Sequence, residues 1–423
     1  MKTILILLGS EFSANGICVS RIVDALLKSG YHVICLVKDG EDPRVINGAE
    51  ILRVKPPLGA KAAAWREKHK GKAAWLLFKL FLAIKKLKLL LLRPVWPIIS
   101  PLYVRRYKKA AEKLVLTHNI DCVFSVFTPF EALLAGHRIK KKHPEVRFIA
   151  YFLDSLSGGV VPRFFSEKST LKRGLKWERK LLVNADRIVY MKSAQKHHGT
   201  HSASNAYYSK MTVLDIPMFT QPESRDTSKP EIDPVLDKTK LNLVYAGSIA
   251  PHVRDPAYFF EVFSLLSSSN IALTIIVPHA YRLPAKYSRD PRIRVLNSLA
   301  HDLVIETLAQ ADILVNLGNK LPSMVPSKIF EYMAAGKPIV STCPIANEPC
   351  IDYLSRYPLC LLLPEHNPDP ARDARALEKF IDDTKGRSVD PAVMRNKLYQ
   401  NTPEALAELI GNVLKGENSC GKS

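Results

Sequence analysis

The chain has 423 residues, 47% of them hydrophobic, so it can build two or three domains with substantial apolar cores. That composition excludes a disordered protein. The seven scattered cysteines include no Cys-x-x-Cys pair, which argues against a zinc site or a disulfide scaffold and favours reduced cytosolic thiols. The formal net charge of +21 predicts an anionic partner.

Residues 1–220 predict an N-terminal α/β domain. An apolar strand over 3–8 is followed by a glycine-containing loop, a helix over 17–29 and a second strand over 32–37. This order is typical of a Rossmann-like domain. The loop lacks the G-x-G-x-x-G motif, and Lys38 stands where a dinucleotide-binding domain has an acidic residue. A nicotinamide dinucleotide is therefore not expected.

The positive charge is concentrated in one segment of this domain. Residues 61–113 contain fifteen Lys and Arg against two Glu, and residues 73–92 combine sixteen apolar residues with four Lys. A central Lys costs about 3 kcal/mol to insert into a bilayer whereas a Leu returns about 0.5, so a spanning helix is disfavoured. We predict that 61–110 is a basic amphipathic insertion that docks on an anionic membrane surface. The alternative is a core helix with a solvated basic face. Nucleic acid is not an expected partner, because no RNA-binding motif or zinc-finger spacing accompanies the charge.

Two further strands of the domain end at polar residues. Thr128 follows an apolar strand, and Asp154 follows the next one. Ligands of open α/β sheets gather at the carboxyl ends of strands, so Thr128 and Asp154 are candidate catalytic residues. Asn15 and Gly16, in the loop after the first strand, are candidate acceptor-side residues by the same reasoning.

The second half repeats the pattern. Residues 221–240 are polar and rich in proline, which predicts a linker. A second Rossmann-like domain is expected over 241–398, and its first strand leads into Gly247 and Ser248. Residues 399–423 are expected to form a C-terminal helix and a frayed tail.

The run over 325–340, VPSKIFEYMAAGKPIV, predicts a helix that ends at a glycine turn and feeds into a strand. Ser327 and Lys328 lie in its first turn, where free N–H groups and the helix dipole favour a phosphate. Glu331, one turn later, can accept hydrogen bonds from two vicinal sugar hydroxyls. The run could also be explained by capping alone, with Ser327 as N-cap and Gly336 as the terminating glycine. Capping does not explain the charges of Lys328 and Glu331.

This run resembles the donor-binding segment of GT-B glycosyltransferases, in particular glycosyltransferase family 4 and its bacterial surface-polysaccharide members. Residues 124–154 also look like family 4. The resemblance implies two Rossmann-like domains that face a cleft, a sugar-nucleotide donor, a retaining mechanism and a ribose contact by Glu331. The sequence departs from the family at Ser323, where many members have a second glutamate, and at Thr128, where many have a histidine.

The leaving diphosphate of such a donor needs positive charge or N–H donors around it. The backbone of Gly247 and Ser248 could supply N–H groups, and Arg254, Lys320 and Lys328 are the candidate cations. No Asp-x-Asp motif follows an apolar strand, so we expect a metal-independent reaction without a cofactor.

A cluster of histidines is the remaining candidate for metal binding. It has no Cys or acidic neighbours at ligand spacing, so we expect a solvated loop there. Its members are His197, His198 and His201.

The resemblance and the basic segment together predict a glycosyltransferase of cell-surface polysaccharide synthesis. It would be cytoplasmic, attached to the inner face of the membrane, and would move a sugar to a lipid-linked or membrane-proximal saccharide. A sugar-nucleotide 2-epimerase of the same fold is an alternative, and a catalytically degenerate partner subunit is another.

Overall fold

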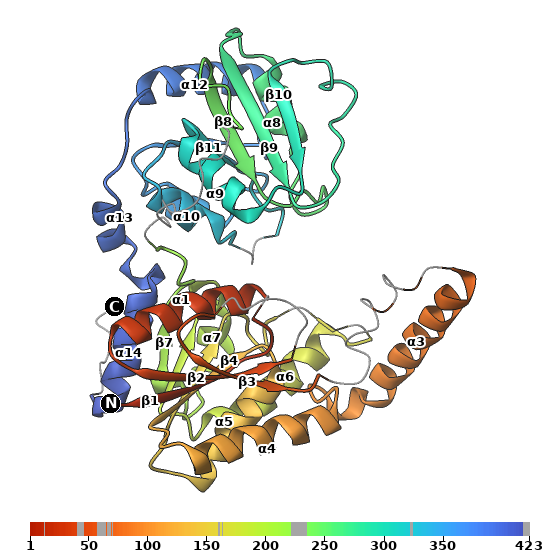
Figure 1. The fold of residues 1–423 in the computed structure, drawn as a ribbon, viewed down its shortest axis with the longest axis vertical. Coiled ribbons are helices and arrows are strands. Elements are labelled where there is room, and N and C mark those ends of the chain that lie inside the picture. The colour runs from red at the N-terminus through yellow and green to blue at the C-terminus, as the bar shows by residue number, and fades with distance from the viewer. Residues whose placement is uncertain are drawn as a thin grey trace. The chain divides into compact units, whose positions relative to one another are not determined.

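The computed structural model describes residues 1–11, 13–39, 46–56, 65, 69, 71–159, 161–162, 164–220, 235–321 and 325–417. The chain divides into two compact units (Figure 1). Unit 1 comprises Met1–Pro217 and Gln400–Ser423, and unit 2 comprises Met218–Tyr399. Most of the predicted linker, residues 221–234, lies outside the described residues.

Unit 1 is built on a seven-stranded parallel sheet of order β3-β2-β1-β4-β5-β6-β7. The chain order reverses between β1 and β4, so the carboxyl ends of these two strands form the switch point at which α/β sheets bind ligands. The strands are β1 (Thr3–Leu7), β2 (His32–Lys38), β3 (Glu50–Val54), β4 (Cys122–Phe127), β5 (Arg147–Phe152), β6 (Arg187–Tyr190) and β7 (Met211–Val213).

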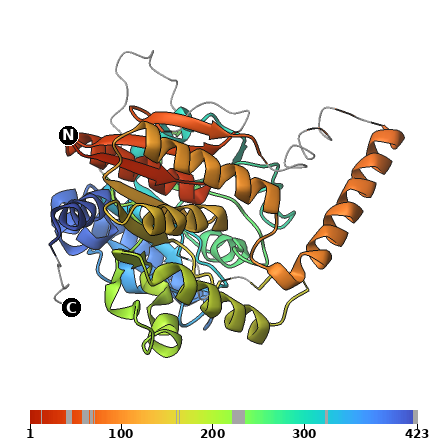
Figure 2. The same ribbon diagram turned by 90° about the horizontal axis from the view of Figure 1, so that it is seen from below.

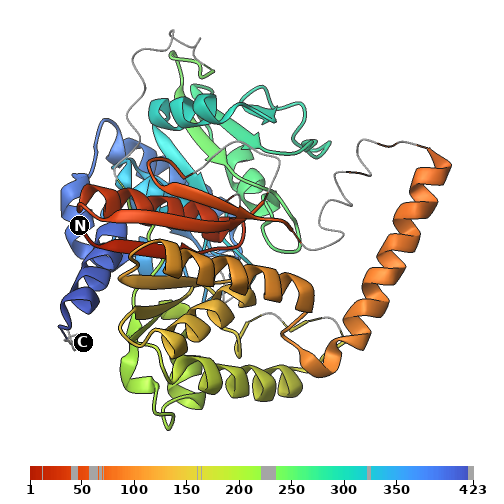
Figure 3. The same ribbon diagram turned by 60° about the horizontal axis from the view of Figure 1, so that its bottom comes forward.

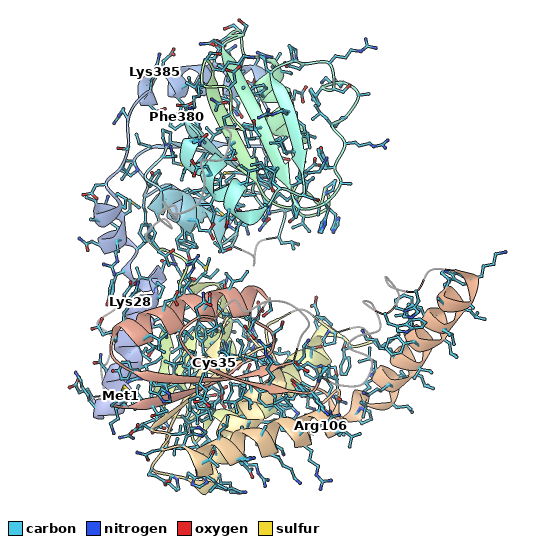
Figure 4. All side chains as sticks on the ribbon, in the orientation of Figure 1. Met1, Lys28, Cys35, Arg106, Phe380 and Lys385 are labelled. Atoms are coloured by element: carbon cyan, nitrogen blue, oxygen red, sulfur yellow. The ribbon has the colours of Figure 1, made fainter. Side chains whose placement is uncertain are left out.

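Helices cover both faces of this sheet, and buried apolar residues fill the space on each side (Figures 2 and 4). On one face α1 packs against α14, the helix that the C-terminal end of the chain contributes to unit 1. On the other face lie α4 and α5. The helices are α1 (Ala14–Lys28), α3 (Lys72–Leu91), α4 (Pro101–Thr117), α5 (Phe130–Lys142), α6 (Glu167–Leu182), α7 (Gln195–His201) and α14 (Pro403–Lys415). Short 3-10 turns are η1 (Arg93–Val95), η2 (Lys192–Ala194), η3 (Tyr208–Lys210) and η4 (Tyr399–Asn401).

The basic segment divides into two different helices. α3 has no buried residue and extends away from the sheet (Figure 3). α4 instead buries Tyr103, Val104 and Tyr107 in the core. The part of the predicted insertion from Pro101 to residue 110 is therefore not an insertion, because one side of α4 is apolar and packs in the domain core. Residues 61–64, 66–68 and 70 lie outside the described residues. Within the described part of the chain, no helix has both the length and the apolar composition that a membrane span requires.

Unit 2 contains a six-stranded parallel sheet of order β10-β9-β8-β11-β12-β13, with its switch point between β8 and β11. α8 and α12 pack together over an aromatic core that contains Phe259, Phe260 and Phe263. Two parallel sheets with helices confirm the predicted α/β class. The strands are β8 (Leu241–Ala246), β9 (Ile271–Val277), β10 (Ile293–Asn297), β11 (Ile313–Asn316), β12 (Ile339–Thr342) and β13 (Cys360–Leu363). The helices are α8 (Ala257–Ser264), α9 (His301–Gln310), α10 (Lys328–Ala334), α11 (Ile351–Leu354), α12 (Pro370–Thr384) and α13 (Pro391–Lys397).

Candidate functional site

Three loops meet at the carboxyl edge of the unit 2 sheet, and hydrogen bonds connect them. Arg254, in the loop after β8, donates from Nη2 to Asn319 Oδ1 at 3.1 Å. The Asn319 N–H, after β11, donates to Glu348 Oε1 at 3.3 Å. Glu348, after β12, also accepts from the Cys350 N–H at 3.0 Å. A guanidinium and a carboxylate are thus held at the switch point, linked by the side chain and the backbone N–H of one asparagine.

Glu348 is an acid enclosed by protein. It is 2% exposed, and this burial raises the pKa of its carboxyl, whereas the hydrogen bonds from Cys350 and Asn319 and, to a lesser extent, the Arg254 charge lower it. Neither Asn319 nor Glu348 was among the predicted site residues. A signal was available, since each lies in the loop that directly follows an apolar strand of the second domain. The sequence did not show which of several polar residues after each strand would turn inward.

The loop after β8 offers fewer free backbone N–H groups than the predicted phosphate cradle. The Gly247 N–H donates to the Ile276 carbonyl at 3.0 Å, so it is already used within the sheet. A Cβ at Gly247 would lie 2.7 Å from the Tyr245 hydroxyl oxygen, which itself donates to the Ser248 carbonyl at 2.8 Å. Glycine is needed here for close packing, and Ser248 is the residue that can still offer a backbone N–H.

Lys320 holds two loops together. Its ammonium group donates to the Pro251 carbonyl at 3.1 Å and to the Asp255 carboxylate at 3.2 Å. Its backbone N–H donates to the Val253 carbonyl at 2.8 Å. These bonds fix the loop that carries Arg254. Lys320 therefore helps to position Arg254, whether or not Lys320 itself contacts a ligand.

α10 lies directly against the carboxyl end of β8. The Tyr332 hydroxyl lies 3.4 Å from the Ala246 nitrogen, next to Gly247. Lys328 and Glu331 are partly buried. The structure therefore places α10, the helix that carries Lys328 and Glu331, against the end of β8 that leads into Gly247.

The ends of α10 bear on the capping explanation. Ser327 occupies the N-cap position, but its side chain makes no capping hydrogen bond among the described residues. Gly336 ends the helix with φ +72°, and a Cβ there would lie 2.5 Å from the Val389 carbonyl oxygen. The glycine is thus structural, whereas the Ser327 hydroxyl is not occupied by capping.

In unit 1, the structure brings the predicted Asn15 and Thr128 together at the switch point. Asn15 Nδ2 lies 3.3 Å from the Phe127 carbonyl oxygen and 3.4 Å from Thr128 Oγ1. A Cβ at Gly16 would lie 2.1 Å from the Glu11 carbonyl oxygen, so only glycine fits. Asp154 follows β5 with an exposed side chain, and partial burial of the carboxyl still raises its pKa.

The expectation of a solvated loop at the histidine cluster is wrong. These residues lie on α7, and His198 is 2% exposed because its ring packs against Tyr190. Burial lowers the pKa of His198 to about 4. Within the described residues, no group of three His, Cys, Asp or Glu side chains could hold a metal ion.

His197 belongs to a polar cluster that the sequence did not reveal. Its Nε2 lies 2.8 Å from Ser157 Oγ, which donates to Glu178 Oε2 at 2.9 Å. The Ser157 N–H donates to Glu178 Oε1 at 2.9 Å. Glu178 is 1% exposed, and burial raises its pKa to about 7.

Comparison with known proteins places this site in context. Residues 240–383 match the family model described as "Glycosyl transferases group 1". This range contains Arg254, Asn319, Glu348 and α10. No curated protein sequence matches the chain.

Several solved structures share the fold. HepE of Anabaena, solved with UDP and glucose, has a TM-score of 0.58 and 13% identity, with 98% of this chain and 100% of that chain covered. The lipopolysaccharide outer core galactosyltransferase WaaB has a TM-score of 0.55 and 11% identity, with 98% and 99% covered. A protein of Listeria monocytogenes assigned as a UDP-N-acetylglucosamine 2-epimerase has a TM-score of 0.56 and 11% identity, with 98% and 96% covered. The chain has the GT-B fold, and together with the family match this supports a glycosyltransferase.

Proposed function

We propose that the protein transfers a sugar from a nucleoside-diphosphate sugar to a lipid-linked or membrane-proximal saccharide, as a surface-polysaccharide enzyme of glycosyltransferase family 4. The observation that carries the proposal is the arrangement in unit 2. Arg254 is held beside buried Glu348, and α10 contacts the adjacent end of β8 through Tyr332. The family match over 240–383 and a fold neighbour solved with UDP support the same donor class.

In the proposed reaction the cations stabilise the leaving group. Arg254 and Lys328 would neutralise the departing diphosphate, and Glu331 would accept hydrogen bonds from the ribose hydroxyls. We infer a metal-independent reaction from the missing Asp-x-Asp motif. Retention follows from the family resemblance, with the leaving phosphate itself as base for the acceptor hydroxyl. Thr128, Asp154 and Asn15 would line the acceptor side.

A lipid-linked acceptor would account for α3. Its exposed side chains include Leu76, Leu80 and Leu91, at 65%, 57% and 69% exposure. Apolar residues this exposed on one helix are costly in water and mark an interaction surface. We propose that α3 lies in the interface of the cytoplasmic face of the membrane, where its lysines reach the headgroups.

Calorimetric titration with a panel of nucleoside-diphosphate sugars tests the donor site. We expect Lys328→Ala and Glu331→Ala each to weaken binding about tenfold to a hundredfold, the usual worth of a hydrogen bond to a charged group. Lys379→Ala, on the exposed side of α12, makes the same chemical change elsewhere in unit 2 and should bind as the wild type does. Wild-type affinity in both site variants would show that the donor site is assigned wrongly.

The fold neighbour from Listeria keeps a second function open, epimerisation of the sugar-nucleotide at C2. An epimerase would convert the donor without an acceptor, whereas a transferase would release the nucleotide only with lipid extract present. Donor conversion measured with and without the extract separates these two enzymes. Donor binding without either reaction would instead indicate a degenerate partner subunit.

A further inference from the structure

A basic groove lies in unit 1 between η1 and α6, with a volume of about 830 Å³. Its lining contains five cations and no acidic residue. The cations are Lys168, Lys172, Arg173, Lys176 and Lys180. None of them forms an ion pair with a carboxylate among the described residues, so the groove carries uncompensated positive charge.

The spacing of these residues explains why the charge gathers on one face. Lys168, Lys172, Lys176 and Lys180 recur every four residues, which places them in one row along α6. Like charges four apart repel and destabilise a helix. Glu178 does not relieve this repulsion, because its carboxylate is buried on another face and bonded to Ser157. Such a row is favourable when an anion covers it.

Hydrogen bonds fix the groove to the base of α3. Arg173 Nη1 donates to the carbonyl oxygens of Arg93 and Pro94 at 2.6 and 3.1 Å. Trp177 Nε1 donates to the Trp96 carbonyl oxygen at 3.2 Å. These bonds clamp η1 onto α6, so the groove begins where α3 ends.

Exposed apolar residues continue along the chain past α3, and Val95 among them lines the groove. Val95, Ile99 and Leu102 are 46%, 49% and 63% exposed. The indole rings of Trp96 and Trp177 are partly buried and line the groove. Three kinds of side chain thus follow one another from α3 to α6: exposed aliphatic side chains, then indoles, then lysines. A bilayer presents matching layers, which are hydrocarbon, interface and phosphate. A nucleic acid or an acidic protein would match the charge but would leave the aliphatic side chains exposed.

We propose that this groove binds the phosphate-bearing headgroup of an anionic phospholipid, so that unit 1 docks through both α3 and the basic face of α6. The proposal extends the proposed membrane attachment, which uses α3 alone, and does not depend on sugar transfer. The lysines would supply the charge attraction to an anionic leaflet, and the indoles would lie at the level of the headgroups.

Vesicle flotation tests the groove with the full-length chain. The variant Lys172→Gln/Lys176→Gln removes two charges from the groove. The control Lys28→Gln/Lys415→Gln removes two exposed charges from α1 and α14, on the other face of the sheet. Each lysine near an anionic surface is worth about fivefold in affinity, so the groove variant should bind phosphatidylglycerol-containing vesicles about 25-fold more weakly than wild type. The control should keep most of the wild-type affinity.

Three further measurements distinguish the outcomes. Neutral phosphatidylcholine vesicles should bind wild type and groove variant equally, because only α3 then contributes. Leu80→Gln/Leu87→Gln on α3 should weaken binding to both kinds of vesicle. Sugar-nucleotide affinity, measured by calorimetry, should be unchanged in the groove variant, so failure of the donor site and failure of the groove remain separate results. The proposal is overturned if the groove variant and wild type bind anionic vesicles equally. It is also overturned if inorganic phosphate or a DNA oligonucleotide binds the groove while the vesicles do not.

Discussion

Replacing Glu178 by Gln should make unit 1 less sensitive to pH. Glu178 is 1% exposed, and its pKa is raised from 4.5 to about 7 by burial. Between these two values the folded protein holds a proton that the unfolded chain has released. The free energy of unfolding therefore falls as the pH rises from about 4.5 to about 7, and this loss is complete above that range.

The size of the effect follows from the two pKa values. A rise from 4.5 to about 7 corresponds to about 3 kcal/mol of unfolding free energy. Gln is neutral at every pH and has the shape of Glu. Its carbonyl oxygen can accept from the Ser157 N–H as Glu178 Oε1 does now. We expect the variant to match the wild type near pH 4.5 and to be more stable by about 3 kcal/mol at pH 8.

Urea unfolding followed by tryptophan fluorescence measures this difference in unit 1 alone. All four tryptophans, Trp65, Trp75, Trp96 and Trp177, lie in unit 1. Other buried acids contribute equally to both proteins and cancel in the comparison. Glu167→Gln, at an exposed position of the same helix, is the matched control and should follow the wild-type curve. If the unfolding free energies of Glu178→Gln and wild type stay parallel from pH 5 to pH 8, the argument from burial is refuted.

Three other substitutions, two of them paired with a control variant, test the packing and the site. Gly336→Ala should lower the free energy of unfolding of unit 2 by about 2 kcal/mol or more, because it adds a clash with a backbone oxygen to a positive φ; Gly386→Ala, with φ +69° but open space around it, should lower it by about 1 kcal/mol. Unit 2 contains no tryptophan, so urea unfolding followed by circular dichroism measures both variants. Tyr107→Phe should lower the free energy of unfolding of unit 1 by about 1–2 kcal/mol, because the buried Tyr107 hydroxyl lies 2.9 and 3.0 Å from the carbonyl oxygens of Leu8 and Leu36. Tyr103→Phe should leave the free energy of unfolding unchanged, because the buried Tyr103 hydroxyl has no hydrogen-bond partner in the described part of the chain. An equal loss of stability in both tyrosine variants would contradict this reasoning. Arg254→Ala should weaken sugar-nucleotide binding by at least about tenfold in calorimetry, because it removes a guanidinium whose charge also acts on buried Glu348. Unchanged affinity would exclude Arg254 from the donor site.

The sequence determined the features that depend on neighbours along the chain. Apolar runs and glycine turns repeat over short distances, so the α/β class and the helix that carries Lys328 and Glu331 could be predicted and were found.

The tertiary structure decided everything that depends on which side chain turns inward. Arg254, Asn319 and Glu348 are far apart in the chain and meet because three strand ends converge. Ser157, Glu178 and His197 form their cluster in the same way. A charged residue in a helix has the same local pattern whether it is solvated or buried, and only the packing of other elements settles its environment and pKa. The same reason applies to α3 and α4, since both helices are rich in Lys and Arg but the sheet covers apolar residues of α4 alone.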